Sequence, residues 1–279
     1  MLKIIAAFDG LKYASSTCEY AINITQSTHS FLVGVFLDDK TYTSYKIYEL
    51  VMEDGVSERK LKKYKDRDHQ LRHSSAHLFA AACKKSGIAF KIHHDSNVAL
   101  QDLLHETIFA DLVIIDGSES FTHYEENHPT RFIRDVLSNT QSPVLLVPQA
   151  FNKTEKIIVL YDGETPSVYA FKMFTYLMTN YANLPVEVLC IKSIESNLHL
   201  PDNKLMKELM SRHYDNVEYT VIRGLPEVEV ISHIRNIKEN VLVVMGAYRR
   251  TMLSRWFRSS LADAIVKELE IPLFIAHNK

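Results

Sequence analysis

The amino-acid sequence repeats itself in three places that keep the same order along the chain. The stretch 3–10, KIIAAFDG, matches 156–163, KIIVLYDG, at an offset of 153 residues. Two further stretches, 111–117 and 142–147, match residues 240–246 and 271–276 at an offset of 129. A chain of 279 residues is long enough for two domains. The repeat therefore predicts two tandem copies of one fold, residues 1–150 and 151–279.

Each copy alternates short apolar runs with helical stretches, and continuous apolar runs are typical of parallel strands covered on both faces. The expected strands of the first copy are 2–8, 31–37, 88–94, 111–115 and 143–147, with helices at 13–27, 58–86, 97–108 and 130–139. Those of the second copy are 156–161, 185–191, 216–222, 240–245 and 271–276, with helices at 166–181, 202–213, 226–238 and 256–269. This alternation predicts an α/β protein with two doubly wound five-stranded parallel sheets, joined by a linker at 148–154.

Glycine is scarce, with 8 residues in the whole chain. The two that stand closest together, Gly34 and Gly55, are 21 positions apart. Neither a dinucleotide fingerprint G-x-G-x-x-G nor a P-loop G-x-x-x-x-G-K can be formed from such a set. Any phosphate site in this protein must be built differently.

Charge and cysteine content limit the classes of partner. The net charge, counted as lysines and arginines less aspartates and glutamates, is 16 − 19 = −3 for residues 1–150 and 16 − 15 = +1 for 151–279. Neither half is therefore basic enough to favour nucleic acid as a partner. Three cysteines without a C-x-x-C pair are typical of a reducing compartment. We expect a cytoplasmic protein, because no stretch is long and apolar enough for a signal peptide or a membrane span.

Both copies place Asp-Gly directly after the first strand, as Asp9-Gly10 and Asp162-Gly163. In open parallel sheets, ligands bind beyond the carboxyl ends of the strands where the strand order reverses. A carboxylate there can accept hydrogen bonds from a ribose hydroxyl or an adenine amino group. The alternative is that Asp-Gly only makes the turn into the next helix, and the sequence leaves both readings open.

The stretch that follows the fourth strand differs sharply between the copies. In the second copy, residues 246–260 carry four arginines and no acid, and they run from a strand end toward a helix N-terminus, which attracts anions. Arg249 and Arg250 are therefore candidates for an anion site. The alternatives are that both are solvated, or that one of them fills the pocket itself. The corresponding stretch of the first copy, 116–129, contains three glutamates, which argue against an anion there.

The histidine spacings and the search for catalytic motifs give weaker indications of function. His69, His73 and His77 have the i, i+4, i+8 spacing of metal ligands on a helix, but helical phase puts them opposite the apolar stripe, on the solvent face. We therefore expect no metal. No G-x-S-x-G elbow, H-E-x-x-H helix or paired catalytic carboxylate is present, so nothing favours a committed catalyst.

The duplicated start with Asp-Gly, the glycine after the fourth strand and the closing runs PVLLV and PLFIA together resemble a tandem universal stress protein. The resemblance covers nearly the whole chain. It implies the adenine-nucleotide-hydrolase-like fold, with strand order 3-2-1-4-5 in each copy, and an ATP or AMP site. It also implies that 144–147 approaches 273–276 within one chain, as a pseudo-dimer, and it allows a homodimer.

The family's phosphate loop reads G-x2-G-x9-G-[S/T]. On the second copy its three glycines fall on Gly246, Arg249 and Ser259, and its hydroxyl on Ser260. Side chains at Arg249 and Ser259 obstruct the close backbone approach that glycine allows. The resemblance further places Asp9 and Asp162 at the family's strand-one aspartate and Ile191 at its adenine-contacting backbone.

Our leading interpretation is a non-catalytic binding or signalling module of the stress response. Its second copy would bind an adenine nucleotide or another anion through a modified phosphate loop. The alternatives are an interaction protein that has lost its small-molecule site, and a slow ATPase with Asp162 near the ribose and Arg249 near the phosphates.

Overall fold

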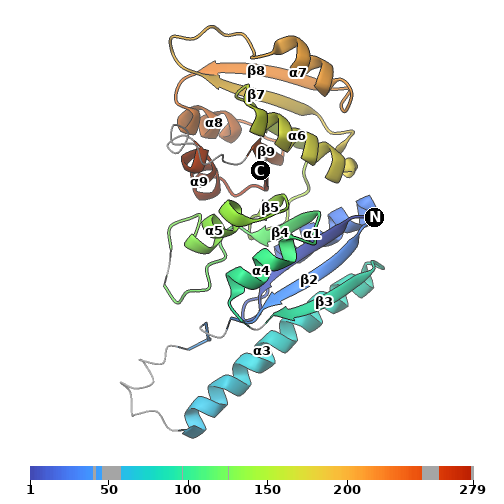
Figure 1. The fold of residues 1–279 in the computed structure, drawn as a ribbon, viewed down its shortest axis with the longest axis vertical. Coiled ribbons are helices and arrows are strands. Elements are labelled where there is room, and N and C mark those ends of the chain that lie inside the picture. Colours follow the sequence, from blue (N-terminus) through green and yellow to red (C-terminus); the bar gives the residue numbers. More distant parts are fainter. Residues whose placement is uncertain (40–41, 46–57, 96, 125, 247–257, 278–279) are drawn as a thin grey trace.

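The computed structural model describes residues 1–39, 42–45, 58–95, 97–124, 126–246 and 258–277 (Figure 1). The first half contains β1 (Lys3–Asp9), α1 (Ser15–Thr28), β2 (Phe31–Leu37), α3 (Glu58–Lys85), β3 (Phe90–Asp95), α4 (Ala99–Thr107), β4 (Leu112–Asp116), α5 (Arg131–Asn139) and β5 (Val144–Val147). The second contains β6 (Lys156–Leu160), α6 (Thr165–Leu177), the 3-10 helix η1 (Thr179–Tyr181), β7 (Val186–Lys192), α7 (Asn203–Met210), β8 (Val217–Arg223), α8 (Pro226–Arg235), β9 (Val241–Gly246), α9 (Arg258–Glu268) and β10 (Leu273–Ala276).

The strands form one ten-stranded sheet in the order β3-β2-β1-β4-β5-β10-β9-β6-β7-β8. Each half has the expected order 3-2-1-4-5, and all strand pairs within a half are parallel. The two halves meet where β5 pairs with β10 antiparallel, with Leu145 opposite Phe274. The two expected sheets are thus continuous, and their last strands pair within one chain.

Alternating side chains of the strands face two hydrophobic layers, as period-two geometry requires. One layer is covered by α1, α3, α6 and α7, with Phe79 and Phe171 among its fully buried residues. The other is covered by α4, α5, α8 and α9, with Leu103 and Ile265 fully buried. Apolar residues therefore cover both faces of the sheet, as the continuous apolar runs predict.

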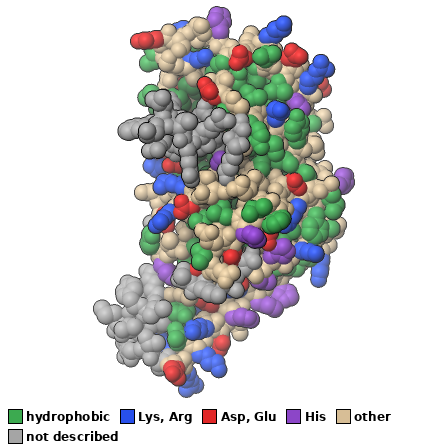
Figure 2. All heavy atoms as spheres, in the orientation of Figure 1, with side chains coloured by type: hydrophobic (Ala, Val, Ile, Leu, Met, Phe, Trp, Pro, Cys, Tyr) green, Lys and Arg blue, Asp and Glu red, His purple; other side chains and the backbone are tan. Residues whose placement is uncertain are grey.

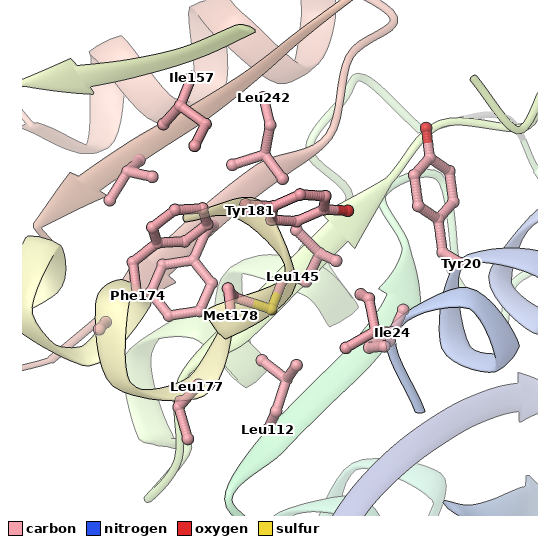
Figure 3. Close-up of a cluster of buried hydrophobic side chains, with 14 of the residues drawn as sticks. Tyr20, Ile24, Leu112, Leu145, Ile157, Phe174, Leu177, Met178, Tyr181 and Leu242 are labelled. Atoms are coloured by element: carbon pink, nitrogen blue, oxygen red, sulfur yellow. The ribbon is translucent and has the colours of Figure 1, made fainter. Parts of the chain in front are cut away.

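Helix α1 and the 3-10 helix η1 that follows α6 meet over the centre of the sheet and join the two halves. Figure 3 shows Tyr181 of η1 between Phe174 on one side and Tyr20 of α1 on the other, with Met178 between Phe174 and Ile24 of α1. The predicted helix 166–181 ends at Leu177 and continues as η1, which carries Tyr181 into the same buried cluster. The hydrophobic core is therefore shared by the two copies.

The long helix α3 reaches beyond the sheet at its amino-terminal end (Figure 1). Its carboxyl-terminal half packs on β2, where Phe79 lies against Gly34. A Cβ atom added at Gly34 would lie 2.6 Å from the Phe79 ring. The glycine inside this strand is thus required by close packing, which is one of the known reasons for glycine in a strand.

Candidate functional site

The strand order reverses at β1 and β4 in the first half and at β6 and β9 in the second. Crevices for ligands form beyond the carboxyl ends of such strand pairs. Because β5 and β10 are antiparallel, the strands of the two halves point in opposite directions. The two crevices therefore lie on opposite sides of the sheet along the strand direction, each beyond the carboxyl ends of the strands of its own half.

In the second half, Asp162 follows β6 and organises the start of α6. Its Oδ1 accepts hydrogen bonds from the backbone N–H of Glu164 at 3.0 Å and from the Ser167 hydroxyl at 2.8 Å. Gly163 has φ +88°, and a Cβ there would lie 2.7 Å from Pro201. The Asp-Gly pair of this copy therefore makes the tight turn into the helix, one of the two readings that the sequence left open.

Gly246 ends β9 directly against the first turn of α6. A Cβ atom added there would meet the backbone of Pro166 and would lie 2.7 Å from the nitrogen of Ser167. The absence of a side chain thus lets the end of the fourth strand of this half touch the amino end of the helix that follows its first strand. Ile191 lies half-buried near the end of β7, opposite Ile222.

The remaining predicted residues of this crevice are placed only in part. Arg249 and Arg250 lie outside the described residues. Helix α9 begins at Arg258, so the backbone of Ser259 and Ser260 belongs to its first turn. The amino ends of α6 and α9 both follow strand ends at the same edge of the sheet, and the partial positive charge of such ends attracts anions.

In the first half, Asp9 is almost completely buried, with 1% of its surface exposed. Its Oδ1 accepts a hydrogen bond from the backbone N–H of Leu11 at 2.8 Å, whereas Oδ2 is buried without a partner in the described part of the chain. Burial, which disfavours the charged carboxylate, raises the pKa of Asp9 to about 6. This carboxyl is far less accessible than its counterpart Asp162.

Gly10 sits beneath a basic side chain of α3. A Cβ atom at Gly10 would meet Asp38 and would lie 3.0 Å from Cγ of Arg72. Arg72 forms an ion pair with Asp38 (Nε to Oδ1, 3.2 Å) and donates to the backbone oxygen of Tyr42 at 3.1 Å. An arginine of the chain itself therefore occupies the edge of the sheet next to the first Asp-Gly turn.

A pocket of about 770 Å³ opens beyond β1 and β4. Its wall includes acidic, basic and histidine side chains, namely Lys12, Asp116, Glu119, His123, Glu126 and His128. Asp116 Oδ1 accepts from the backbone N–H of Ser118 at 2.7 Å and from its hydroxyl at 2.6 Å. Burial, and after it the negative charge of Asp9, raises the pKa of Glu119 to about 8.

Lys12 is the basic side chain that approaches these acids, and it is turned toward an aromatic ring. Its Nζ lies 5.7 Å from the ring centroid of Tyr42, and a hydrogen bond to Tyr42 raises the pKa of Lys12. Sequence reasoning did not single out Lys12, Asp38 or Arg72. Arg72 is 62 positions from Gly10, and only the packing of α3 brings the two together.

His69 and His73 of α3 line a second pocket, of about 550 Å³, together with Asp38, Arg72 and His94. Figure 2 shows histidine side chains gathered on the lower part of the molecule, where α3 lies. Within the described ranges, no group of three His, Cys, Asp or Glu side chains could hold a metal ion. The helical spacing of His69 and His73 therefore brings no third ligand of this kind to them among those residues.

Comparison with known proteins gives a fold. No family model matches the sequence, and no curated protein matches it. The structure is similar to a universal stress protein from Archaeoglobus fulgidus DSM 4304, with a TM-score of 0.71 and 13% identity over 99% of this chain and 98% of that chain. It is also similar to a functionally unknown protein from Pseudomonas aeruginosa PAO1, with a TM-score of 0.59 and 12% identity over 99% and 92% of the two chains.

At these identities the likeness concerns the fold. The chain has the fold of a universal stress protein along nearly its whole length, which confirms the fold that the sequence predicts. No described helix combines the length and the apolar character that crossing a membrane would need.

Proposed function

We propose that this chain is a cytoplasmic tandem universal stress protein that acts as a non-catalytic binding or signalling module. The crevice of its second half would take an adenine nucleotide or another anion. The observation that carries the proposal is the contact of Gly246 with the first turn of α6, beside the turn built by Asp162. It supports a site between the end of β9 and the amino ends of α6 and α9, to which the arginines of the sequence stretch 246–258 would contribute.

In this proposal the predicted residues of the second half have defined roles, and Asp9 and Gly10 of the first half take no part. Arg249 and Arg250 pair with phosphate oxygens, and the first turn of α9 with Ser259 and Ser260 donates hydrogen bonds to them. Asp162, Gly163 and the backbone near Ile191 face the nucleoside. Because arginine replaces the second glycine of the family's loop, guanidinium groups take over the phosphate contacts that backbone N–H groups make there.

Calorimetric titration of the full chain with ATP and with AMP tests the proposal. We expect binding that weakens at least about 10-fold in a double variant, Arg249→Ala and Arg250→Ala, because two charged hydrogen-bonding partners are lost. Arg212→Ala removes one exposed arginine elsewhere in the second half and should leave the affinity unchanged. If about millimolar nucleotide produces no heat of binding and no shift in the melting temperature, that result would contradict nucleotide binding.

The second candidate is an interaction protein without a small-molecule site. It is favoured by the side chains that replace two glycines of the loop, and by the engagement of Asp162 Oδ1 with Glu164 and Ser167. Native mass measurement of the purified chain distinguishes the two functions. Copurified nucleotide would contradict the second candidate.

A further inference from the structure

Two buried cysteines from different helices meet in the first half of the protein. Cys18 lies near the amino end of α1, and Cys83 lies in the last turn of α3. Both are free thiols in the same hydrophobic layer, with 2% and 0% of their surfaces exposed. They are 83 − 18 = 65 positions apart in the sequence, so the packing of the two helices brings them together.

The two thiols are in hydrogen-bond contact. The Cys83 thiol donates to the sulfur of Cys18, and the Tyr13 hydroxyl donates to the same sulfur. The two helices are joined nearby as well, because Gln26 Nε2 of α1 donates to the backbone oxygen of Ser86, directly after α3, at 2.8 Å. A disulfide needs two cysteines on adjacent backbone segments, and this pair of helices provides them.

The two sulfurs are prepared for different parts in a reaction. The hydrogen bond from Cys83 lowers the pKa of Cys18 and outweighs the opposing effect of burial, and the bond from Tyr13 acts in the same direction as that from Cys83. The amino end of α1, with its partial positive charge, also favours a thiolate at Cys18. The pKa of Cys83 is raised, because its proton is held between the two sulfurs. Cys18 is therefore the nucleophile of the pair.

Tyr13 connects the thiol pair with the surface of the protein. Its side chain belongs to the wall of the pocket of about 770 Å³ beyond β1 and β4, and its hydroxyl contacts Cys18. A small oxidant in that pocket is thus separated from the Cys18 sulfur by one side chain. The third cysteine, Cys190, is buried on β7 in the other half of the sheet.

We propose that Cys18 and Cys83 form a reversible disulfide when the protein meets a peroxide, and that this modification fastens α1 to α3. In a reducing compartment such a bond is transient, which is typical of cysteine pairs that respond to oxidants. The modification does not depend on the nucleotide site of the second half, because no residue is shared between them.

The reaction with hydrogen peroxide has two steps. The Cys18 thiolate attacks one oxygen, the O–O bond breaks, and the departing hydroxide takes up the proton that the Cys18 thiol has released; Cys18 becomes a sulfenic acid. The sulfur of Cys83 then attacks the sulfur of Cys18, the S–O bond breaks, and hydroxide leaves with the Cys83 proton as water. Two thiols thus lose two electrons and two protons, and the peroxide is reduced to two molecules of water.

Mass spectrometry of the reduced full chain after treatment with about 1 mM hydrogen peroxide tests the proposal, with the remaining thiols alkylated in denaturant. We expect one alkylated cysteine instead of three. Tryptic digestion without a reductant should yield the peptides 13–40 and 73–84 joined by a disulfide. Dithiothreitol should restore three alkylated cysteines, because a disulfide is reversible and the higher oxidation products of cysteine are not.

Two variants assign the roles. Cys83→Ser should abolish the disulfide and leave Cys18 as a sulfenic acid that dimedone labels. Cys190→Ser is the matched control, since it removes the buried cysteine of the other half, and it should leave the rate of disulfide formation within about two-fold. Three alkylated cysteines after peroxide treatment of the unmodified protein would overturn the proposal. A disulfide that includes Cys190, or one that joins two chains, would overturn it as well.

Discussion

Glu187 and Lys156 form a buried ion pair in the second half, with Oε2 and Nζ 2.9 Å apart and only 3% of the Glu187 side chain exposed. The other oxygen of Glu187 lies 2.8 Å from Nε2 of His233 and accepts from Thr220 at 2.6 Å. The Glu187 carboxylate on β7 thus links β7 to Lys156 of β6, Thr220 of β8 and His233 of α8.

The first half contains a cluster of the same three residue types around Lys3, which begins β1. Nζ of Lys3 lies 3.2 Å from Oε2 of Glu106, and Oε1 of Glu106 lies 2.6 Å from Nδ1 of His93. Lys3 and Lys156 are equivalent in the repeat, whereas the other two types exchange places between strand and helix. Glutamate lies on α4 and histidine on β3 in the first half, while β7 and α8 carry Glu187 and His233 in the second. The charge arrangement is therefore shared although its sequence positions are not.

Glu187→Gln tests the contribution of this cluster. Breaking a buried pair leaves the lysine without its main partner, and we expect a loss of about 2–4 kcal/mol in the free energy of unfolding at pH 7. Chemical denaturation measures it. Glu218→Gln is the matched control, because this second partner of Lys156 is 67% exposed and should cost at most about 1 kcal/mol. Similar losses in the two variants would contradict the expectation that the buried ion pair contributes more to the free energy of unfolding than the exposed one.

The same variant has a defined dependence on pH. Burial opposes ionisation of Glu187, but hydrogen bonds from Thr220 and Lys156 and the charge of His233 outweigh it and lower the pKa. A lowered pKa stabilises the fold above the ordinary pKa of 4.5, and this stabilisation is lost as the pH falls through the folded value. The difference between the unmodified protein and Glu187→Gln should therefore shrink below about pH 4.5.

The fold could be predicted from the sequence because its signals are local. Apolar runs such as 112–115 and 241–245 mark buried parallel strands without any knowledge of their neighbours, and the repeat showed that the two halves share one plan. The strand order within each half was implied by the family resemblance. The approach of β5 to β10 was also implied by that resemblance, whereas the antiparallel direction of the pair comes from the structure. The end of α6 at Leu177 was missed, since apolar residues continue through Met178 and Tyr181 and mask the change to a 3-10 helix.

The site was less predictable because its partners are distant in the sequence. Asp9 ends β1 and Asp162 follows the equivalent strand β6, yet Asp9 is buried and Asp162 is exposed. The difference comes from elements that pack around them, including α3 with Arg72 and the loop with Glu119. The sequence shows that the acids of 116–129 would repel a phosphate. It does not show which of these carboxyl groups is buried and therefore has a raised pKa, because burial depends on the folded structure.

Gly246→Ala tests the contact between β9 and α6. A methyl group there collides with the backbone of Pro166 and Ser167, which cannot move as a flexible side chain could. We expect a loss of about 1–3 kcal/mol in the free energy of unfolding. Gly117→Ala is the control at the equivalent position of the first half, where the nearest atom would lie 3.6 Å away, and its effect should stay within about 0.5 kcal/mol. A neutral Gly246→Ala variant would show that the strand end can retreat from the helix.

Tyr20→Phe tests how the linker is held on α1. The Tyr20 hydroxyl donates to the backbone oxygen of Asn152 at 3.0 Å and accepts from its N–H at 3.2 Å. Removing the hydroxyl leaves both backbone groups without this partner, and we expect a loss of about 1–2 kcal/mol. Amide hydrogen exchange at Asn152 should increase as well. Tyr176→Phe, at an exposed tyrosine of α6, should change neither measurement.

Glu119→Gln should make the protein more stable in alkaline solution. Burial and the charge of Asp9 raise the pKa of Glu119 from its ordinary 4.5 to about 8. Between these values the unfolded chain ionises this carboxyl while the folded protein keeps the proton, so the free energy of unfolding decreases as the pH rises. The variant has no such loss and should exceed the unmodified protein by on the order of 1 kcal/mol at pH 9, while the two agree near pH 4. Denaturation curves recorded at both pH values check this, and equal stability at pH 9 would show that the pocket already compensates the charge.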